Sequence, residues 1–483
     1  MNGASRQTPI FPSRENYVDS ANTSESPSAS LALNLGSTTQ SNLPVHYDAP
    51  GQVFSPADCG GQSRARLAAI LLRYFVEEIS HWFDICDPDR HFARVVPQRA
   101  RACPPLLHAI LTASSRHITR LPGFRNRDGD FGWKDMVIPG LDEDTALHYH
   151  NHCIKELLNL SGDLEQINNE NLLAAAIVLR FYEEIDSPLE NHDDKGVLLR
   201  VLNIFVNAQL PSAAAFPRSL LEIHYSGLSP LPESDHNRPF PTQNNYTEAS
   251  GLRRSCFWVA FRQELYKSFM TQQPFTLPLS RWESFRALSP AGTGTWTDRL
   301  VLFCADVLEY CYGSSETNLI PSTDKGRWWD LVQYVEALAD NLPPCFEPIY
   351  TLEPSSTTGE IFPEVWFSDG SYATGTAHLE LAKMLLAVFD PTRPKLGHGH
   401  MAAMRALTAT MRSTVTRLCG IALHNRRSPP VFVDATMAIS ACGEYFTDED
   451  EREALLGVLR LTEVEYAWPT GNIAEKLKRA WMA

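Results

Sequence analysis

The sequence contains no pair of cysteines at the CxxC spacing, although it holds ten cysteines among its 483 residues. This absence excludes a thioredoxin-type redox motif and a compact zinc site built on thiolates. The cysteines are scattered and mostly flanked by apolar residues, which is typical of buried free thiols in a reducing compartment. We therefore expect no metal held by cysteine, and we expect no cofactor.

Positive charge is also in short supply. The chain has 42 Lys and Arg against 57 Asp and Glu, a formal net charge of −15. Such a chain repels phosphate backbones, so DNA binding would need a local basic module, and no such module is present. No uninterrupted apolar stretch of about 18 residues occurs, and the N-terminal residues lack the apolar region of a secretory signal. These features predict a protein of the cytosol or nucleus without a membrane span.

Strand patterns rich in alternating Val and Ile are sparse, which predicts an all-α fold. Residues 1–62 are rich in Ser, Thr, Asn, Pro and Gly and show no sustained apolar period, so we expect a disordered N-terminal tail. Over residues 63–483, apolar residues recur at three- and four-residue steps. This pattern predicts a single large helical domain.

Within that domain, individual helices and two loops are predicted. Residues 170–186 are apolar nearly all round, which predicts a helix at the centre of the domain. Pro, Ser and Asn concentrate at 226–248 and 351–370, which we interpret as long surface loops. Helices are expected from Ser63 to near Cys86, after Cys103, after Asp144, and over 170–186, 195–208, 213–224, 251–272, 297–313, 326–341, 373–389, 399–424, 432–446, 448–463 and 472–482.

Motifs of catalysis and of metal or phosphate binding are missing or incomplete. The Gly292-Thr293-Gly294 segment precedes a predicted helix, but it follows no strand and lacks the lysine of a phosphate-binding loop, so a flexible loop is favoured. His148 and His152 share one helical face without a third ligand beside them, and His398 and His400 lie in a glycine-rich turn. We expect neither pair to hold a metal and find no catalytic residue.

Three polar residues that we expect to be buried are the candidates for ligand binding. Arg180 follows the apolar run of residues 172–179, and Arg262 follows a similar run on a later helix, each close to a glutamate. Ion pairs that fix helix register are the favoured interpretation of both arginines. The alternative is a polar floor for a small-molecule pocket, lined by Arg180, Arg262 and His378.

Five further segments of the helical region stand out: 71–117, YHNHCIKELL at 149–158, NENLLAAAIVLRFYEEID at 169–186, LRRSCFWVAFRQELYKSFMTQQPF at 252–275, and 418–470. Together they resemble the fungal-specific transcription factor domain, the all-helical regulatory region of the zinc-cluster regulators. The resemblance extends in order from about residue 63 to residue 483.

The resemblance implies a nuclear transcriptional regulator, with other transcription factors or co-regulators as partners and a small-molecule effector as a further candidate. The family's DNA-binding module needs six cysteines in a compact basic stretch, whereas residues 1–62 contain one cysteine, Cys59, with Arg6 and Arg14. We therefore expect regulation of a metabolic or secondary-metabolite pathway without direct DNA binding by this chain. The alternative is a helical domain repurposed as a small-molecule-binding protein or enzyme.

Overall fold

The computed structural model of the chain describes residues 59–163, 165–186, 205, 251–313, 324–354 and 359–482. The predicted tail up to residue 58, the predicted helices over 195–208 and 213–224, and the predicted loop over 226–248 lie outside these residues, Phe205 excepted.

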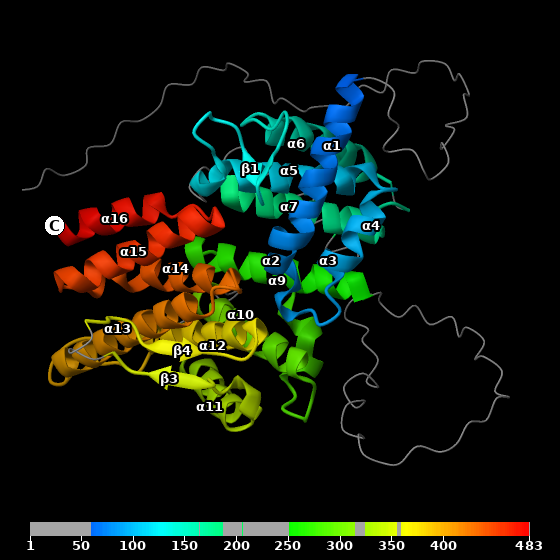
Figure 1. Cartoon of the computed structure of the whole chain (residues 1–483). Coiled ribbons are helices and arrows are strands. Elements are labelled where there is room, and N and C mark those ends of the chain that lie inside the picture. The colour runs from blue at the N-terminus through cyan, green and yellow to red at the C-terminus, as the bar shows by residue number, and fades with distance from the viewer. Residues whose placement is uncertain are drawn as a thin grey trace, which may run out of the picture. The chain divides into compact units, whose positions relative to one another are not determined.

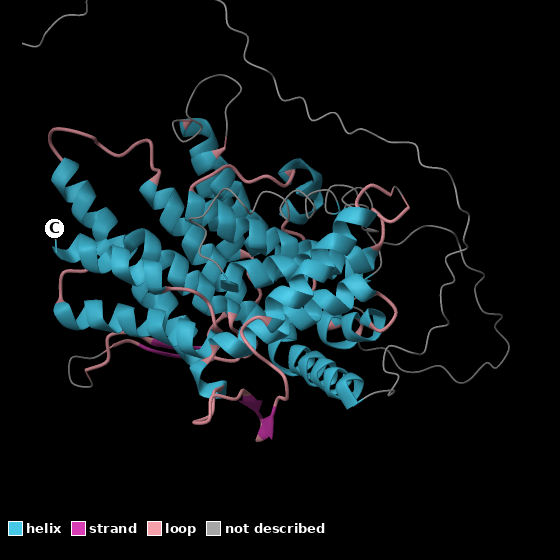
Figure 2. Ribbon diagram, turned by 90° about the horizontal axis from the view of Figure 1, so that it is seen from above, coloured by secondary structure: helices cyan, strands magenta, loops and turns pink. Residues whose placement is uncertain are grey.

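The described part of the chain is almost entirely helical, as Figure 1 and Figure 2 show, so the predicted all-α class is confirmed. Most predicted helices begin and end within a few residues of their observed bounds. The α-helices are α1 (Cys59–Tyr74), α2 (Ser80–Phe83), α3 (His91–Arg94), α4 (Val96–Ala100), α5 (Pro104–Arg120), α6 (Thr145–Leu160), α7 (Glu170–Asp186), α9 (Gly251–Thr271), α10 (Thr293–Tyr312), α11 (Lys325–Asp340), α12 (Gly370–Val388), α13 (His400–His424), α14 (Pro430–Cys442), α15 (Glu449–Tyr466) and α16 (Gly471–Met482).

Two short antiparallel hairpins interrupt the helices. One pairs β1 (Gly132–Trp133) with β2 (Met136–Val137), and the other pairs β3 (Tyr350–Leu352) with β4 (Glu364–Trp366). Apart from Tyr350, the second hairpin lies within the range 351–370, so the prediction of a long surface loop there was wrong for its strands. Such a short pair offers too few alternating residues to be visible in the sequence, and its cross-strand contact between Tyr350 and Trp366 is non-local.

The first predicted helix runs to Cys86 as expected, but it is not a continuous α-helix. A π-turn over Phe75–Ile79 separates α1 from α2, and a 3₁₀ turn over Asp84–Cys86 ends the segment. The helix also starts at Cys59, inside the range predicted as tail. The residues that follow, Asp87 and Pro88, end the helix because the residue before a proline disfavours the α conformation.

The α7 helix is buried along most of its length, which confirms its predicted place in the core. Leu172 through Tyr182 are all buried, including Arg180. α7 packs against α5 and α9, α10 packs against α12, and α13 packs against α14. Among the described helices, none is long and apolar enough to cross a membrane.

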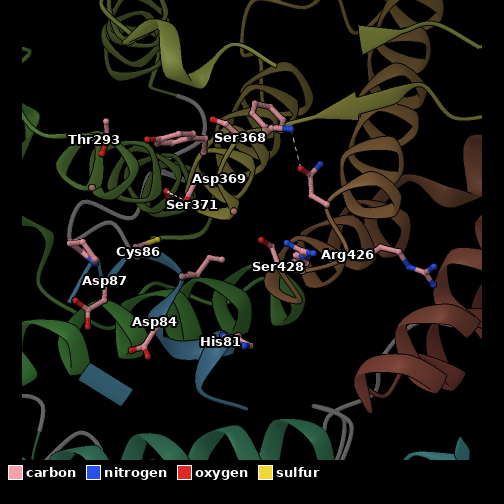
Figure 3. A pocket seen from close by; sticks show the side chains of 18 of the residues that line it. His81, Asp84, Cys86, Asp87, Thr293, Ser368, Asp369, Ser371, Arg426 and Ser428 are labelled. Atoms are coloured by element: carbon pink, nitrogen blue, oxygen red, sulfur yellow. Dashed lines mark hydrogen bonds between the residues drawn. The ribbon is translucent and has the colours of Figure 1, made fainter. Parts of the chain in front are cut away.

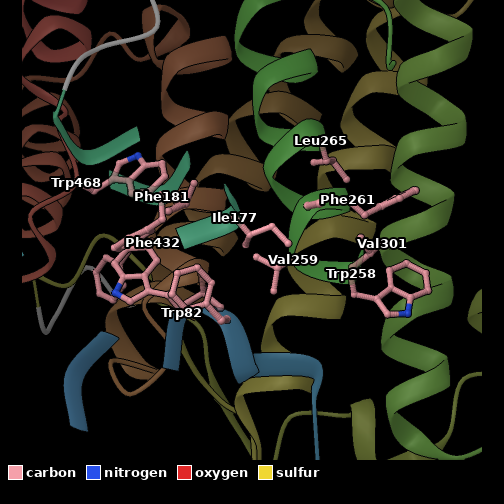
Figure 4. Packing of buried hydrophobic residues seen from close by; sticks show 14 of the residues in the cluster. Trp82, Ile177, Phe181, Trp258, Val259, Phe261, Leu265, Val301, Phe432 and Trp468 are labelled. Carbon is pink, nitrogen blue, oxygen red and sulfur yellow. The ribbon is translucent and has the colours of Figure 1, made fainter. Parts of the chain in front are cut away.

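Aromatic rings join the two ends of the described chain. Trp82 packs on Phe181 with ring centroids 5.2 Å apart and stacks on Trp468 at 5.5 Å. Figure 4 shows Trp82, Phe181, Phe432 and Trp468 gathered in one part of the core. The segment after α15 is therefore part of the same core as α2 and α7, and not an appendage.

Candidate functional site

Arg180 lies in a buried ion-pair network between α7 and α9. Its Nε lies 3.3 Å from Glu184 Oε1, and its Nη2 lies 3.3 Å from Glu264 Oε2. Nη2 also donates a hydrogen bond to the Gln263 carbonyl at 2.7 Å. Burial raises the pKa of Glu184 to about 7, although the charge of Arg180 acts in the opposite direction. These contacts agree with the interpretation of Arg180 as a residue that fixes helix register.

Arg262 and His378 belong to a second buried polar group, between α9, α12 and α14. His378 Nδ1 lies 2.9 Å from the Thr374 carbonyl and 3.5 Å from Asp434 Oδ2. Burial lowers the pKa of His378 to about 4, and the charge of Arg262 lowers it further. Burial also raises the pKa of Asp434, against the effect of Arg262. The charge of Arg262 thus acts on both His378 and Asp434, whereas Arg180 belongs to a different network.

A cavity of about 950 Å³ is lined by the segment that follows Phe83. Arg262 Nη2 donates to the Phe83 carbonyl at 3.0 Å, directly before the first wall, residues 84–88. The other walls are residues 366–372, residues 423–428 and the first residues of α10. Figure 3 shows side chains from all four segments around the same space. The volume is in the range of small-molecule sites in proteins, which is about 300 to 1,000 Å³.

None of the three residues predicted from the sequence lines this cavity. Its polar residues were missed because they stand on loops and helix starts, where the sequence shows no periodic signal. One of its walls does include Thr293 and Gly294, from the segment considered as a phosphate-binding loop. Their place on a cavity wall depends on the packing of α10 against the 84–88 segment.

The 84–88 wall is held in place by its own acidic side chains. Asp84 is buried and accepts hydrogen bonds from the backbone N–H groups of Phe92 and Ala93, each at 2.8 Å. Burial raises the pKa of Asp84 to about 6, although these two hydrogen bonds lower it. Asp87 Oδ2 accepts from the His91 N–H at 2.8 Å and from the Ser255 hydroxyl at 2.9 Å. Both carboxylates therefore already have protein partners.

The 366–372 wall connects β4 to α12. Asp369 is the N-cap of α12, and its Oδ1 accepts from the Ser371 N–H at 2.8 Å, which is the usual role of an aspartate at this position. The Asn425 side chain fixes the wall from α13, since its Oδ1 accepts from the Phe367 N–H at 3.1 Å and its Nδ2 donates to the Val365 carbonyl at 2.8 Å.

The wall of residues 423–428 approaches the wall of residues 366–372 so closely that only a glycine fits between them. A Cβ atom placed on Gly370 would lie 1.9 Å from Ser428 Oγ. Ser428 is 4% exposed, and its hydroxyl has no hydrogen-bond partner within the described part of the chain. Gly370 therefore lets the start of α12 and the turn between α13 and α14 share one side of the cavity.

The cavity does not contain an activated cysteine. Cys86 lines it, but burial raises the pKa of this thiol to about 12, which keeps it protonated near neutral pH. A protonated thiol is a poor nucleophile, so the cavity is suited to binding rather than to covalent chemistry through Cys86.

One cluster among the described residues has the composition of a metal site. Ligand atoms of Asp87, Asp89 and His91 lie within 4.8 Å of one another. Asp87 Oδ2 already accepts from the His91 ring and from Ser255, so its oxygens are engaged within the protein. The predicted pair His148 and His152 has ring centroids 4.8 Å apart, and neither residue belongs to a metal-like cluster within the described part of the chain.

A second cavity, of about 640 Å³, lies near the Arg180 network. Glu184 lines it, together with Tyr266, Lys267 and Ser440. Glu184 connects this cavity to Arg180 through their ion pair, but Arg180, Arg262 and His378 do not line it.

Comparison with known proteins gives a match in the first half of the range predicted as one helical domain. Residues 70–283 match the fungal-specific transcription factor domain, which confirms the resemblance over that range. The chain is 20% identical over 509 aligned positions to a transcription activator, AMTR1, of Alternaria alternata. That alignment covers 86% of this chain and 63% of the relative, so the chain spans less than two thirds of the relative's length. No solved structure matches the chain.

Proposed function

We propose that this chain, whose residues 70–283 form a match to the fungal-specific transcription factor domain, regulates transcription. That match is the observation that carries the proposal. The similarity to a transcription activator over 86% of this chain supports it. A nuclear location follows from the proposal, because a regulator of transcription acts where the genes are.

The 483 residues act through partner proteins rather than by reading DNA themselves. Residues 1–62 hold a single cysteine, which is insufficient for two zinc ions, and the net charge of −15 opposes binding to phosphates. The partners in this proposal are other transcription factors or co-regulators. The regulated genes are those of a metabolic or secondary-metabolite pathway, by analogy with the family.

A reporter experiment tests the proposal even while the target genes are unidentified. The full chain is fused to a heterologous DNA-binding domain, and transcription of a reporter that carries the matching operator is measured in a fungal host. We expect a change of several-fold in either direction relative to the DNA-binding domain alone. The Trp468→Ala variant, which removes a core ring, should abolish the change if the folded domain is responsible.

The alternative function is a small-molecule-binding protein or enzyme outside transcription. The cavity of about 950 Å³ is the observation in its favour. Deleting the gene and comparing transcripts under several growth conditions separates the two. A defined set of changed transcripts agrees with regulation of transcription, whereas unchanged transcripts together with a missing metabolite would favour the alternative.

A further inference from the structure

The α10 helix begins at the 950 Å³ cavity with its N-terminus uncapped by any side chain. The N-cap residue is Gly292, and no side chain accepts a hydrogen bond from the first turn of this helix. Thr293 and Gly294 line the cavity, and a Cβ atom on Gly294 would have only the Cys86 carbonyl within 4 Å, at 3.8 Å. The first N–H groups of a long helix attract negative charge, because they are unpaired and stand at the positive end of the helix dipole.

An independent feature on another wall also points to a ligand. Ser428 is 4% exposed and lines the cavity, and its hydroxyl has no partner among the described residues. Figure 3 shows Ser428 beside the open space, between Asp369 and Arg426. The Ser428 oxygen is not among the fully enclosed polar atoms of the described residues, so it is open to the cavity, where a ligand can hydrogen-bond to it.

One cationic side chain at the cavity is available to an anion, whereas the acidic side chains are engaged with the protein backbone. Asp84, Asp87 and Asp369 each accept hydrogen bonds from backbone N–H groups of the protein. Arg427, in contrast, is an exposed residue that lines the cavity and forms no ion pair with any residue that the structure describes. The acids are therefore satisfied by the protein, while a guanidinium, a hydroxyl and a helix start remain available to a ligand.

We propose that this cavity binds a small organic anion. Its carboxylate or phosphate meets Arg427 and the Ser428 hydroxyl, a second acceptor group meets the N-terminus of α10, and its apolar body lies against Trp366 and Tyr372. Guanidinium groups bind carboxylates and phosphates through charge-assisted hydrogen bonds, and aromatic walls bury the rest of such a ligand. This proposal does not depend on transcription, so the two can fail separately.

Binding is tested on the purified full chain by isothermal titration calorimetry at constant ionic strength. The probes are inorganic phosphate, phenyl phosphate, phenylacetate and the uncharged benzyl alcohol. We expect at least one ring-bearing anion to bind in the millimolar range or better, and benzyl alcohol to bind at least tenfold more weakly. The comparison of phenyl phosphate with phenylacetate tells which acidic group the cavity prefers.

Three variants locate the binding. Arg427→Gln should weaken it about tenfold, since a hydrogen bond to a charged group is worth about that factor, and Ser428→Ala should weaken it severalfold. Gly294→Leu places a large side chain in the cavity at the first turn of α10 and should abolish binding. The control is Arg405→Gln, because Arg405 is an exposed arginine of α13 that does not line the cavity. Absence of binding for every anion up to about 20 mM, or equal binding by all four variants and the unmodified chain, would overturn the proposal.

Discussion

Trp82 and Trp468 stack with ring planes 17° apart and centroids 5.5 Å apart, although 386 residues separate them in the chain (468 − 82). Tyr266 meets the same Trp468 ring edge-on at 5.1 Å. The residues that precede and follow the central helices are thus joined in one aromatic cluster. The stability of the domain should depend on its C-terminal segment as much as on α7.

Replacing Trp468 by alanine should therefore destabilise the whole domain. Truncating a buried tryptophan costs about 3 to 5 kcal/mol of unfolding free energy, through lost burial and the cavity left behind. Urea denaturation followed by circular dichroism measures the change. The matched control is Trp329→Ala, because Trp329 is 51% exposed and should cost far less. Equal losses for the two variants would contradict the role assigned to the Trp82–Trp468 contact.

Removing the last two helices should prevent folding. A chain that ends at Thr447 loses α15, α16 and Trp468, together with buried Leu455, Leu459 and Leu477. Each such side chain contributes about 1.5 to 3 kcal/mol when buried, against a net stability of about 5 to 15 kcal/mol. We expect insoluble or molten protein, judged by the loss of a cooperative thermal transition.

The opposite truncation is predicted to be tolerated. A chain that starts at Ser63 keeps Leu67, Ile70, Leu71 and Tyr74, which are buried residues of α1. It should melt cooperatively within a few degrees of the full-length protein. A large decrease in its melting temperature would mean that residues 1–62 contribute to the core, contrary to the predicted domain boundary.

Removing Arg180 while its two glutamate partners remain should destabilise the folded protein. In Arg180→Met, the carboxylates of Glu184 and Glu264 lose their shared guanidinium in a buried place. Removing one partner of a buried ion pair costs about 3 to 5 kcal/mol. Arg460→Met is the control, because Arg460 pairs with Glu453 where both side chains are about two thirds exposed, and it should change stability by less than about 1 kcal/mol.

A further variant distinguishes charge from packing in this network. In the triple variant Arg180→Met, Glu184→Gln and Glu264→Gln, no buried carboxylate is left without its guanidinium, so part of the lost stability should return. Lys267 loses its contact with Glu264 in this variant, but its side chain is 25% exposed and reaches water. Chemical denaturation at pH 7.5 gives the unfolding free energies of the unmodified chain, Arg180→Met and the triple variant. If the triple variant is as unstable as Arg180→Met, the loss comes from packing and not from the buried carboxylates.

His117 should make the protein less stable in mild acid. Burial lowers the pKa of His117 to about 4, and the nearby charge of Arg120 lowers it further, whereas an unfolded histidine titrates near about 6.5. Between these values the unfolded chain binds a proton that the folded chain does not. The contribution of His117 is thus complete above about pH 6.5 and is lost as the pH falls toward 4, by up to roughly 3 kcal/mol.

The variant His117→Gln should remove this pH dependence. It keeps a polar group near the Tyr74 hydroxyl, which lies 2.7 Å from His117 Nδ1. Unfolding free energies are compared between pH 7 and pH 5, and the exposed His398→Gln serves as control. Burial raises the pKa values of Glu184 and Asp298 to about 7, so these two groups make stability change with pH in the opposite direction to His117. The effect of His117 is therefore the difference between the variant and the unmodified chain in how the unfolding free energy changes with pH. Identical slopes for His117→Gln and the unmodified chain would contradict the assignment.

Duplex DNA should not bind tightly to this chain. The net charge of −15 leaves little basic surface to displace counterions from the phosphates. Titration of labelled DNA at about 50 and 200 mM salt should show only weak association. Tight binding with a steep salt dependence would mean that DNA is contacted directly, and the proposed route through partner proteins would have to be abandoned.

The helices of this protein were largely determined by its local sequence. The apolar run of residues 172–179 predicted a core helix, and α7 is one, because a helix that is apolar all round must be covered by others. The helix predicted over 448–463 also begins within one residue of α15, whose N-cap is Asp448, with its Oδ1 accepting from the N–H groups of Asp450 and Glu451. Such patterns act within a few residues of the chain, so a single sequence reveals them.

The cavity was decided by tertiary structure alone. Its walls come from residues 84–88, the start of α10, 366–372 and 423–428, which no local pattern connects. Asn425 joins the 423–428 segment to the residues that lead into α12, through hydrogen bonds to Phe367 and Val365. Gly370 lets the start of α12 lie close to Ser428 of the same segment. These are contacts between residues more than fifty positions apart, and their geometry depends on how the helices pack, which periodicity and capping signals do not encode.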